Sequence, residues 1–90
     1  LGASFAPLPA SAKQYYRLSS GIVVTSVERG SFFERYGLGA NTIIVQVNGK
    51  AVNNINDLDA ALAGSRNGVA RIEGITAEGM RFLLNFPLGA

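Results

Sequence analysis

Histidine and cysteine, two residue types that carry much of enzyme chemistry, are both absent from this 90-residue chain. Without histidine the chain lacks the usual general base, the Ser-His-Asp triad and the commonest metal ligand. Without cysteine it has no thiol nucleophile, no zinc knuckle and no disulfide. We therefore expect no catalytic residue, no metal site and no cofactor within these ninety residues.

The six carboxylates are what remains for acid–base chemistry. A pair of carboxylates can carry out a glycosidase-type reaction. Here each of the six lies in a polar or turn-like stretch, which favours solvated surface charges. They are Glu28, Glu34, Asp57, Asp59, Glu73 and Glu78.

The composition is that of one small folded domain spanning residues 1–90, with 48% hydrophobic and 16% charged residues. No stretch approaches the roughly 20 apolar residues of a membrane-spanning helix. The net charge is +2, and the basic residues stand singly, often beside an acid as in Glu28-Arg29. A nucleic-acid surface clusters its basic residues instead. We expect no membrane span and no nucleic-acid partner. Because the chain begins without methionine, we take it as a fragment of a longer protein.

The first half of the chain predicts short strands. Residues 1–8 predict a strand that stops at Pro7-Leu8-Pro9. Residues 10–20 have no clean period and predict a connecting loop with room for one helical turn. Residues 21–28 are β-branched on both faces, the pattern of a central strand that is covered on both sides.

Local turn and cap signals organise the middle of the chain. Ser31 and Glu34 predict a capping box at the start of a short helix over residues 32–36, and Gly37 stands where such a helix ends. An apolar strand over residues 41–47 follows. It stops at Asn48-Gly49, the favoured dipeptide of a type I′ hairpin, and a short return over residues 50–52 comes next.

Residues 53–64 predict the longest helix of the chain, with Asn54 as N-cap and Gly64 at its end. Its predicted apolar stripe consists of Ile55, Leu58 and Leu62. Residues 68–75 and 79–86 predict a closing hairpin. Alternation in the second strand predicts a buried face formed by Met80, Phe82, Leu84 and Phe86.

These elements predict an α+β, mainly β fold: a small, partly open barrel or sandwich of five or six short strands capped by two helices.

The stretch "GIVVTSVERGSFFERYGLGANTIIVQVNGKAVNNINDLDAAL", residues 21–62, resembles the middle of a bacterial PDZ domain. Its most specific elements are the Gly37-Leu38 that closes the short helix and the Asn48-Gly49-Lys50 turn. The element order, with a strand such as "LGASF" first and the long helix before the last hairpin, is similar to the circularly permuted PDZ domains of HtrA (Deg) serine proteases. The second, C-terminal PDZ of the Do-like members is the most similar.

The resemblance implies a peptide-binding module. It would capture protein C-termini, extended hydrophobic segments or unfolded polypeptide by β-strand addition. The attached trypsin-like serine endopeptidase would have its catalytic domain upstream, and the protease domain and a sibling PDZ of the same chain would be further partners. A homo-oligomeric parent in the bacterial periplasm or cell envelope is also implied.

The resemblance places the ligand site on two segments. The carboxylate loop would be Leu1-Gly2-Ala3, and the strand edge would continue through Ser4 and Phe5. The apolar pocket would be lined by Leu58, Ala61 and Leu62 of the long helix. Gly37-Leu38-Gly39-Ala40 looks like a carboxylate loop, but its register matches the corner between the short helix and the next strand.

Three departures from the family pattern keep a second hypothesis open. Asn41-Thr42 stands where Gly-Asp is common, Phe32-Phe33 where a Pro-Ala pair is usual, and Ala3 where a larger aliphatic residue is. The chain could therefore be a degenerate PDZ that packs against protease or sibling domains and supports the oligomer without capturing peptide. An exposed Phe32 or Phe33 beside a closed groove would favour that alternative.

Overall fold

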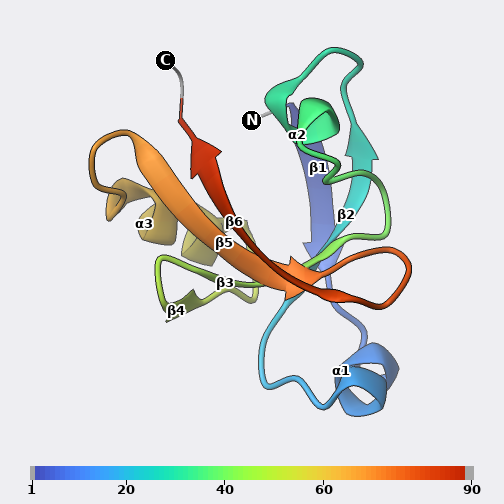
Figure 1. Ribbon diagram of the computed structural model, residues 1–90. Helices are drawn as coiled ribbons and strands as arrows, with labels where there is room; N and C mark the ends of the chain where they lie inside the picture. The colour runs from blue at the N-terminus through green and yellow to red at the C-terminus, as the bar shows by residue number, and fades with distance from the viewer. Residues whose placement is uncertain (1, 89–90) are drawn as a thin grey trace.

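A six-stranded antiparallel sheet and three helices make up residues 2–88, the part of the chain that this computed structural model describes (Figure 1). The strands are β1 (Ala3–Pro7), β2 (Ile22–Val27), β3 (Ile43–Val47), β4 (Lys50–Ala51), β5 (Val69–Ile75) and β6 (Arg81–Pro87). The helices are α1 (Ala10–Tyr16), α2 (Phe32–Arg35) and α3 (Ile55–Ala63).

The sheet runs in the order β1-β2-β3-β5-β6, and the short β4 pairs with β3 beside this path. It does not close on itself, so β1 and β6 are its edge strands. Figure 1 shows α2 beside the β1–β2 pair and α3 at the opposite side of the curved sheet. The predicted mainly β fold is confirmed, as an open sheet with three helices where we expected two.

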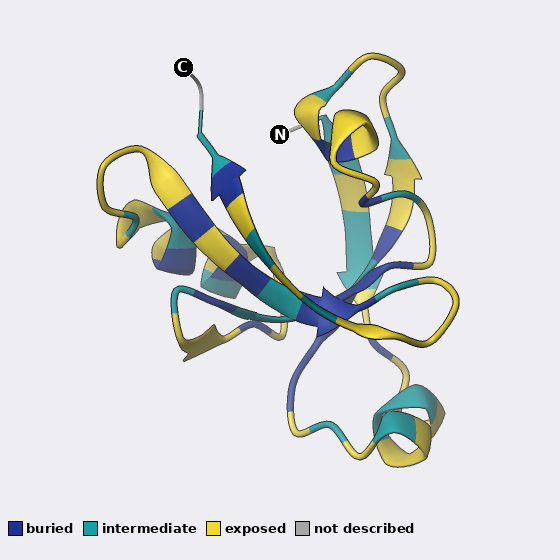
Figure 2. Cartoon of the chain, viewed as in Figure 1, coloured by how far each residue is buried: buried dark blue, intermediate teal, exposed yellow. Residues whose placement is uncertain are grey.

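Helix α1 is the element that the sequence did not predict as a helix. It has no side-chain N-cap and ends at Arg17, a non-glycine residue with a left-handed φ of 57°. None of its residues is fully buried (Figure 2). Ala12 and Tyr16 pack against a small second core built on Leu8, Ile43 and Ile75. Tertiary contacts therefore stabilise a helix whose own sequence has neither a side-chain N-cap nor a clear period.

Helix α2 has the predicted caps at both ends. The Ser31 hydroxyl oxygen accepts from the Glu34 amide at 3.3 Å, as in a capping box. Glu34 reaches back to the Gly30 amide at 2.7 Å, one residue further than the predicted box requires. At the other end Gly37, with φ 77°, donates to the Glu34 carbonyl, and Leu38 donates to the Phe33 carbonyl. These two bonds form a Schellman motif.

The main core lies between the sheet and helices α2 and α3. It gathers buried side chains from four strands, both helices and the adjoining loops: Ile22, Val24, Phe33, Leu38, Ile44, Val47, Val52, Leu58, Ala61, Ala70, Ile72 and Phe86. Phe33 is at its centre, because its ring meets Phe86 edge-on at 5.1 Å and Phe5 at 5.7 Å. Burying one such side chain contributes about 1.5 to 3 kcal/mol, so Phe33 joins β1, α2 and β6 firmly.

Two side chains that the sequence assigned to the core are exposed. Ile55 is 45% exposed and Met80 is 69% exposed. Met80 lies in the turn before β6, where the Thr76 amide donates to its carbonyl, so the alternation of the strand does not yet apply to it. Ile55 is the first residue of α3, so it lies at the exposed end of the helix, one turn before the buried Leu58. None of the three described helices has the length and apolarity needed to cross a membrane.

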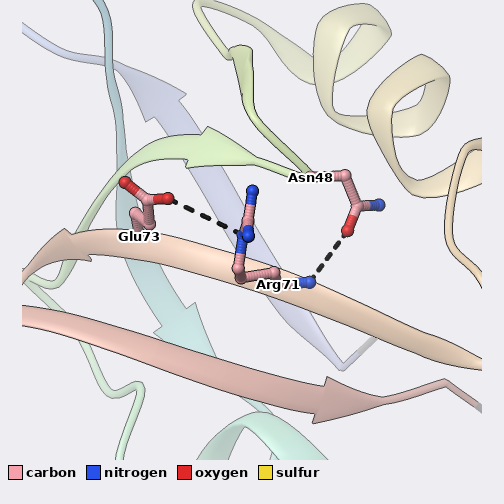
Figure 3. A network of polar contacts seen from close by, with 3 residues as sticks. All are labelled: Asn48, Arg71 and Glu73. Atoms are coloured by element: carbon pink, nitrogen blue, oxygen red, sulfur yellow. Dashed lines mark hydrogen bonds and ion pairs between the residues drawn. The ribbon is translucent and has the colours of Figure 1, made fainter.

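Asn48 ties α3 to the sheet. Its backbone φ of 53°, followed by Gly49 at 79°, gives the predicted reverse turn between β3 and β4. The side-chain amide donates to the Ala61 carbonyl and to the Ser65 hydroxyl, each at 2.9 Å. Its oxygen accepts from the Arg71 amide at 2.9 Å (Figure 3). One side chain thus joins the turn, the last turn of α3 and β5.

The ion pair next to this network contributes less. Arg71 and Glu73 approach to 3.8 Å on the sheet surface, and their side chains are 53% and 41% exposed (Figure 3). Exposed pairs of this kind contribute at most about 1 kcal/mol. Both residues of the ion pair lie on β5, so the pair does not join α3 to the sheet, whereas Asn48 does.

Replacing Asn48 with glycine keeps the left-handed backbone conformation and removes only the side chain. We expect Asn48→Gly to lower the free energy of unfolding by about 1.5 to 3 kcal/mol, because three side-chain hydrogen bonds are lost. Urea denaturation followed by circular dichroism measures this change.

Asn67→Gly is the matched control. Asn67 has a φ of 57°, also precedes a glycine, and makes no side-chain hydrogen bond within residues 2–88. We expect its stability to change by less than about 0.5 kcal/mol. If Asn48→Gly costs no more than Asn67→Gly, the Asn48 side chain does not hold α3 in place.

Candidate functional site

A narrow apolar groove lies between β1 and the start of α3. Its volume is about 160 Å³, and five of its six lining residues are apolar. The sheet side consists of Phe5, Ala6, Pro7 and Ile22, and the helix side of Asn54 and Ile55. A groove of this size and lining suits one apolar side chain better than a polar or charged one.

The helix side of the groove is fixed by a reciprocal cap. The Asn54 side-chain oxygen accepts from the Asp57 amide at 2.8 Å. The Asp57 carboxylate in turn accepts from the Asn53 amide at 2.9 Å. The side chains of Asn54 and Asp57 thus form hydrogen bonds within the start of α3. The exposed Ile55 side chain is the apolar surface of α3 that lines the groove.

The sheet side of the groove is an edge strand. Within residues 2–88, β1 pairs only with β2, from Ala3 opposite Val27 to Pro7 opposite Ile22. The second edge of β1 therefore keeps unpaired backbone groups, which an extended chain can use. Phe5 is half-buried and its ring packs on Phe33, so this edge is anchored to the main core.

Gly2 begins this edge with a conformation that requires glycine. Its φ is +75°, and a Cβ atom there would lie 2.5 Å from the Cβ of Ser31. Its carbonyl accepts from the Glu28 amide at 2.7 Å, which fixes it against the end of β2. The left-handed conformation of Gly2 is thus fixed by its neighbours, and it turns the chain into β1.

A second hollow of about 350 Å³ lies on the α2 side of Gly2. Its lining includes one acid, Glu28, and one base, Arg35. These opposite charges offset each other, so the side chains beside Gly2 supply no net positive charge. An anion at this end of β1 would depend on backbone amides.

The predicted site residues fall into two groups. Gly2, Ala3, Ser4 and Phe5 lie at or along β1, and Phe5 lines the groove. Leu1 lies outside the described residues. On α3, Leu58 and Ala61 are buried in the main core and Leu62 is half-buried against it. Contact of these eight residues with a ligand stays a prediction.

The groove also contains residues that the sequence prediction did not include: Ala6, Pro7, Ile22, Asn54 and Ile55. Ile55 could have been found from helical geometry. It lies three residues before Leu58 and seven before Leu62, so it shares a helix side with two residues that the prediction had already placed at the site. Pro7 and Ile22 could not be found in this way, since only the β1–β2 register brings them together.

The Gly37-Leu38-Gly39-Ala40 segment lies at the corner between α2 and β3, as its register predicts. Leu38 is buried in the main core, and the Thr42 amide donates to the Gly39 carbonyl in a tight turn. None of the four residues lines the groove. The described residues also contain no cluster of three acidic side chains that could hold a metal ion.

Comparisons with known proteins bear on this geometry. A search of curated proteins found no match. Among solved structures, the chain is similar to the HtrA3 PDZ domain in its crystal structure with a phage-derived ligand, FGRWV, with 25% sequence identity and a TM-score of 0.70. The match covers 99% of this chain and 81% of that one, so it includes both β1 and α3.

The sequence model of PDZ domains matches residues 23–73, from β2 to the middle of β5. This is more than half of the chain, and it contains the short helix, the Asn48-Gly49 turn and the long helix on which the resemblance rests. The fold, the groove and both matches agree: the chain belongs to the PDZ domain family.

Proposed function

We propose that this domain captures the C-terminal ends of polypeptides, or extended hydrophobic segments, by adding them as a strand to the free edge of β1. The observation that carries the proposal is the open apolar groove along that edge. The peptide ligand of the similar HtrA3 PDZ domain supports it. A PDZ domain is a binding module, and its own residues catalyse no reaction.

Backbone groups would provide most of the attraction. An added strand pairs its N–H and C=O groups with those left free on β1. If it runs antiparallel to β1, its C-terminal end lies at Gly2 and its upstream end at Pro7. The positive φ of Gly2 departs from strand geometry, and we expect this turn to direct successive amides toward the ligand, as in an anion-binding nest. The terminal carboxylate would bind there.

The register gives each ligand side chain a position. The last ligand residue would lie opposite Ala3 and the third-last opposite Phe5, because paired residues repeat every two positions. Directly opposite residues share a face of the sheet. Ala3 and Phe5 pack toward the main core, so both ligand side chains would point toward α3. The last would approach Leu62, and the third-last would enter the groove beside Ile55.

The parent protein is part of the proposal. We propose an HtrA-type, trypsin-like serine protease, homo-oligomeric and located in the bacterial periplasm or cell envelope. The similarity to the HtrA3 PDZ domain supports the protease connection. In that setting this domain, as a C-terminal PDZ, would bring unfolded substrates to a catalytic domain upstream.

A structural role without peptide capture is the second candidate, and the surface of α2 favours it. Phe32 is 40% and Tyr36 is 43% exposed. Both rings lie edge-on to the buried Phe86, at 6.5 and 5.5 Å. Phe33, the other candidate for exposure, is completely buried. The groove beside β1 has a volume of about 160 Å³ and an apolar lining, which favours peptide capture as the primary function.

Ile55→Glu tests peptide capture. The substitution places a carboxylate on the groove, while an acid at the first position of α3 favours the helix and preserves the fold. We expect the affinity for acetyl-Gly-Val-Trp-Val, which has a free C-terminus, to fall at least about tenfold, since burying an unpaired charge costs more than about 1.4 kcal/mol. The protein contains no tryptophan, so the anisotropy of the ligand's tryptophan reports binding.

Met80→Glu is the control, because Met80 is a more exposed apolar residue in the turn before β6, outside the groove. Its affinity should remain within about twofold of the original chain. Equal weakening by both substitutions, or none by Ile55→Glu, would contradict binding in this groove.

Phe32→Gln distinguishes peptide capture from a structural role of the α2 surface. Phe32 lies on α2, outside the groove, so we expect peptide affinity within about twofold of the original chain. If the α2 surface is an association site, loss of the ring lowers the sedimentation coefficient of the assembly at a fixed concentration. A variant that loses peptide binding but keeps its sedimentation coefficient would contradict this division of roles.

A further inference from the structure

Along β1, the backbone N–H and C=O groups of successive residues point alternately toward β2 and toward the free edge. At one end the Gly2 carbonyl accepts from Glu28 of the neighbouring segment, and at the other the Leu8 amide donates to Gly21 at 3.4 Å. Gly2 and Leu8 are six residues apart, so both ends agree on one alternation. Even-numbered residues of β1 point their backbone groups toward β2, and odd-numbered residues point theirs toward the free edge.

The odd-numbered residues are Ala3, Phe5 and Pro7. The irregularity in the pairing between Ser4 and Phe5 leaves this alternation intact, because the additional residue, Thr25, lies on β2. Ala3 and Phe5 each present an N–H and a C=O to the free edge. Pro7 has no N–H and presents only its carbonyl.

We infer that Pro7 ends the set of backbone donors, so that this domain holds only the last four residues of a C-terminal tail by complete strand pairing. The inference rests on the proposed function. In the register set by Gly2, the last ligand residue pairs with Ala3, the third-last with Phe5 and the fifth-last with Pro7. The carbonyl of the fifth-last residue therefore finds no donor on β1.

This limit defines the kind of partner. Upstream of the fourth-last residue, an extended ligand backbone gains little binding free energy, because it forms no further complete set of hydrogen bonds with β1. A short free tail that projects from a folded protein meets the requirement. The chain beyond Pro7 continues through Pro9 into α1, so β1 itself offers no later donor to an added strand.

Pro7 also lines the groove beside Ile55, with an exposed side chain. A proline on an edge strand limits unwanted pairing with other chains. The position of Pro7 lets a short tail pair completely with β1, and it leaves the upstream residues of a longer strand without a donor on β1.

Two ligands that differ by one glycine residue, and so by the carbonyl of the fifth-last position, test the inference. Acetyl-Gly-Val-Trp-Val carries the carbonyl of the fifth-last position in its acetyl group, and acetyl-Val-Trp-Val lacks it. We expect the original chain to bind both within about twofold. Pro7→Ala restores an N–H at the free edge, and this variant should bind the longer ligand about two- to tenfold more tightly than the shorter one.

Pro9→Ala is the matched control. Pro9 is the residue before α1, outside the groove, and its replacement should leave the ratio of the two affinities unchanged. In Pro7→Ala the new amide of residue 7 gives a second measurement. Its hydrogen exchange should slow when the longer ligand binds and stay fast with the shorter one.

Two outcomes overturn the inference in distinguishable ways. If both ligands bind saturably and Pro7→Ala binds them equally well, peptide capture stands but Pro7 does not limit it. If neither ligand binds the original, folded chain at any attainable concentration, the proposed function fails and the inference fails with it.

Discussion

The proposed function of this domain depends on the edge of β1 that stays unpaired within residues 2–88. A sheet edge that exposes backbone donors and acceptors invites pairing with any extended chain. In this domain access to that edge is limited by its surroundings. The turn at Gly2 begins it, Pro7 removes its third donor, and the apolar groove lies alongside. The result is a short free edge with a defined start and a defined end, where the proposed ligand would add as a strand.

A binding edge of this kind needs a second side at a fixed distance, and α3 provides it. The reciprocal hydrogen bonds of Asn54 and Asp57 fix the start of the helix beside the groove. Asn48 fixes its last turn to β5. The ring of Phe5 on Phe33 anchors β1 to the same core that holds Leu58. Both sides of the groove are thus held by contacts that the ligand does not need to form.

Much of the fold could be predicted because its signals are local. The cap at Ser31, the glycine at Gly37 and the Asn48-Gly49 turn each act over three or four residues, and the sequence alone shows them. Helix α1 escaped prediction because its stability comes from packing against a second core formed by distant segments. Met80 was misplaced because the turn continues one residue further than the alternation suggests.

The candidate site was predicted in part, for a similar reason. Resemblance to PDZ domains pointed to β1 and α3, and the groove lies between these two elements. Its detailed lining depends on the β1–β2 register and on the angle at which α3 meets the sheet, which no local pattern encodes. Ile55 shows this best, because it shares a stripe with the buried Leu58, yet at the start of α3 it lines the groove and stays exposed.

The central claim is that a free C-terminal carboxylate brings a peptide to the edge of β1. An NMR titration of the ¹⁵N-labelled chain with acetyl-Gly-Val-Trp-Val, repeated with the same peptide amidated at its C-terminus, tests it directly. The account predicts saturating shifts of the Ala3 and Phe5 amides with the free acid and almost none with the amide. Unmoved amides in a well-folded spectrum, or equal shifts with both peptides, would contradict it.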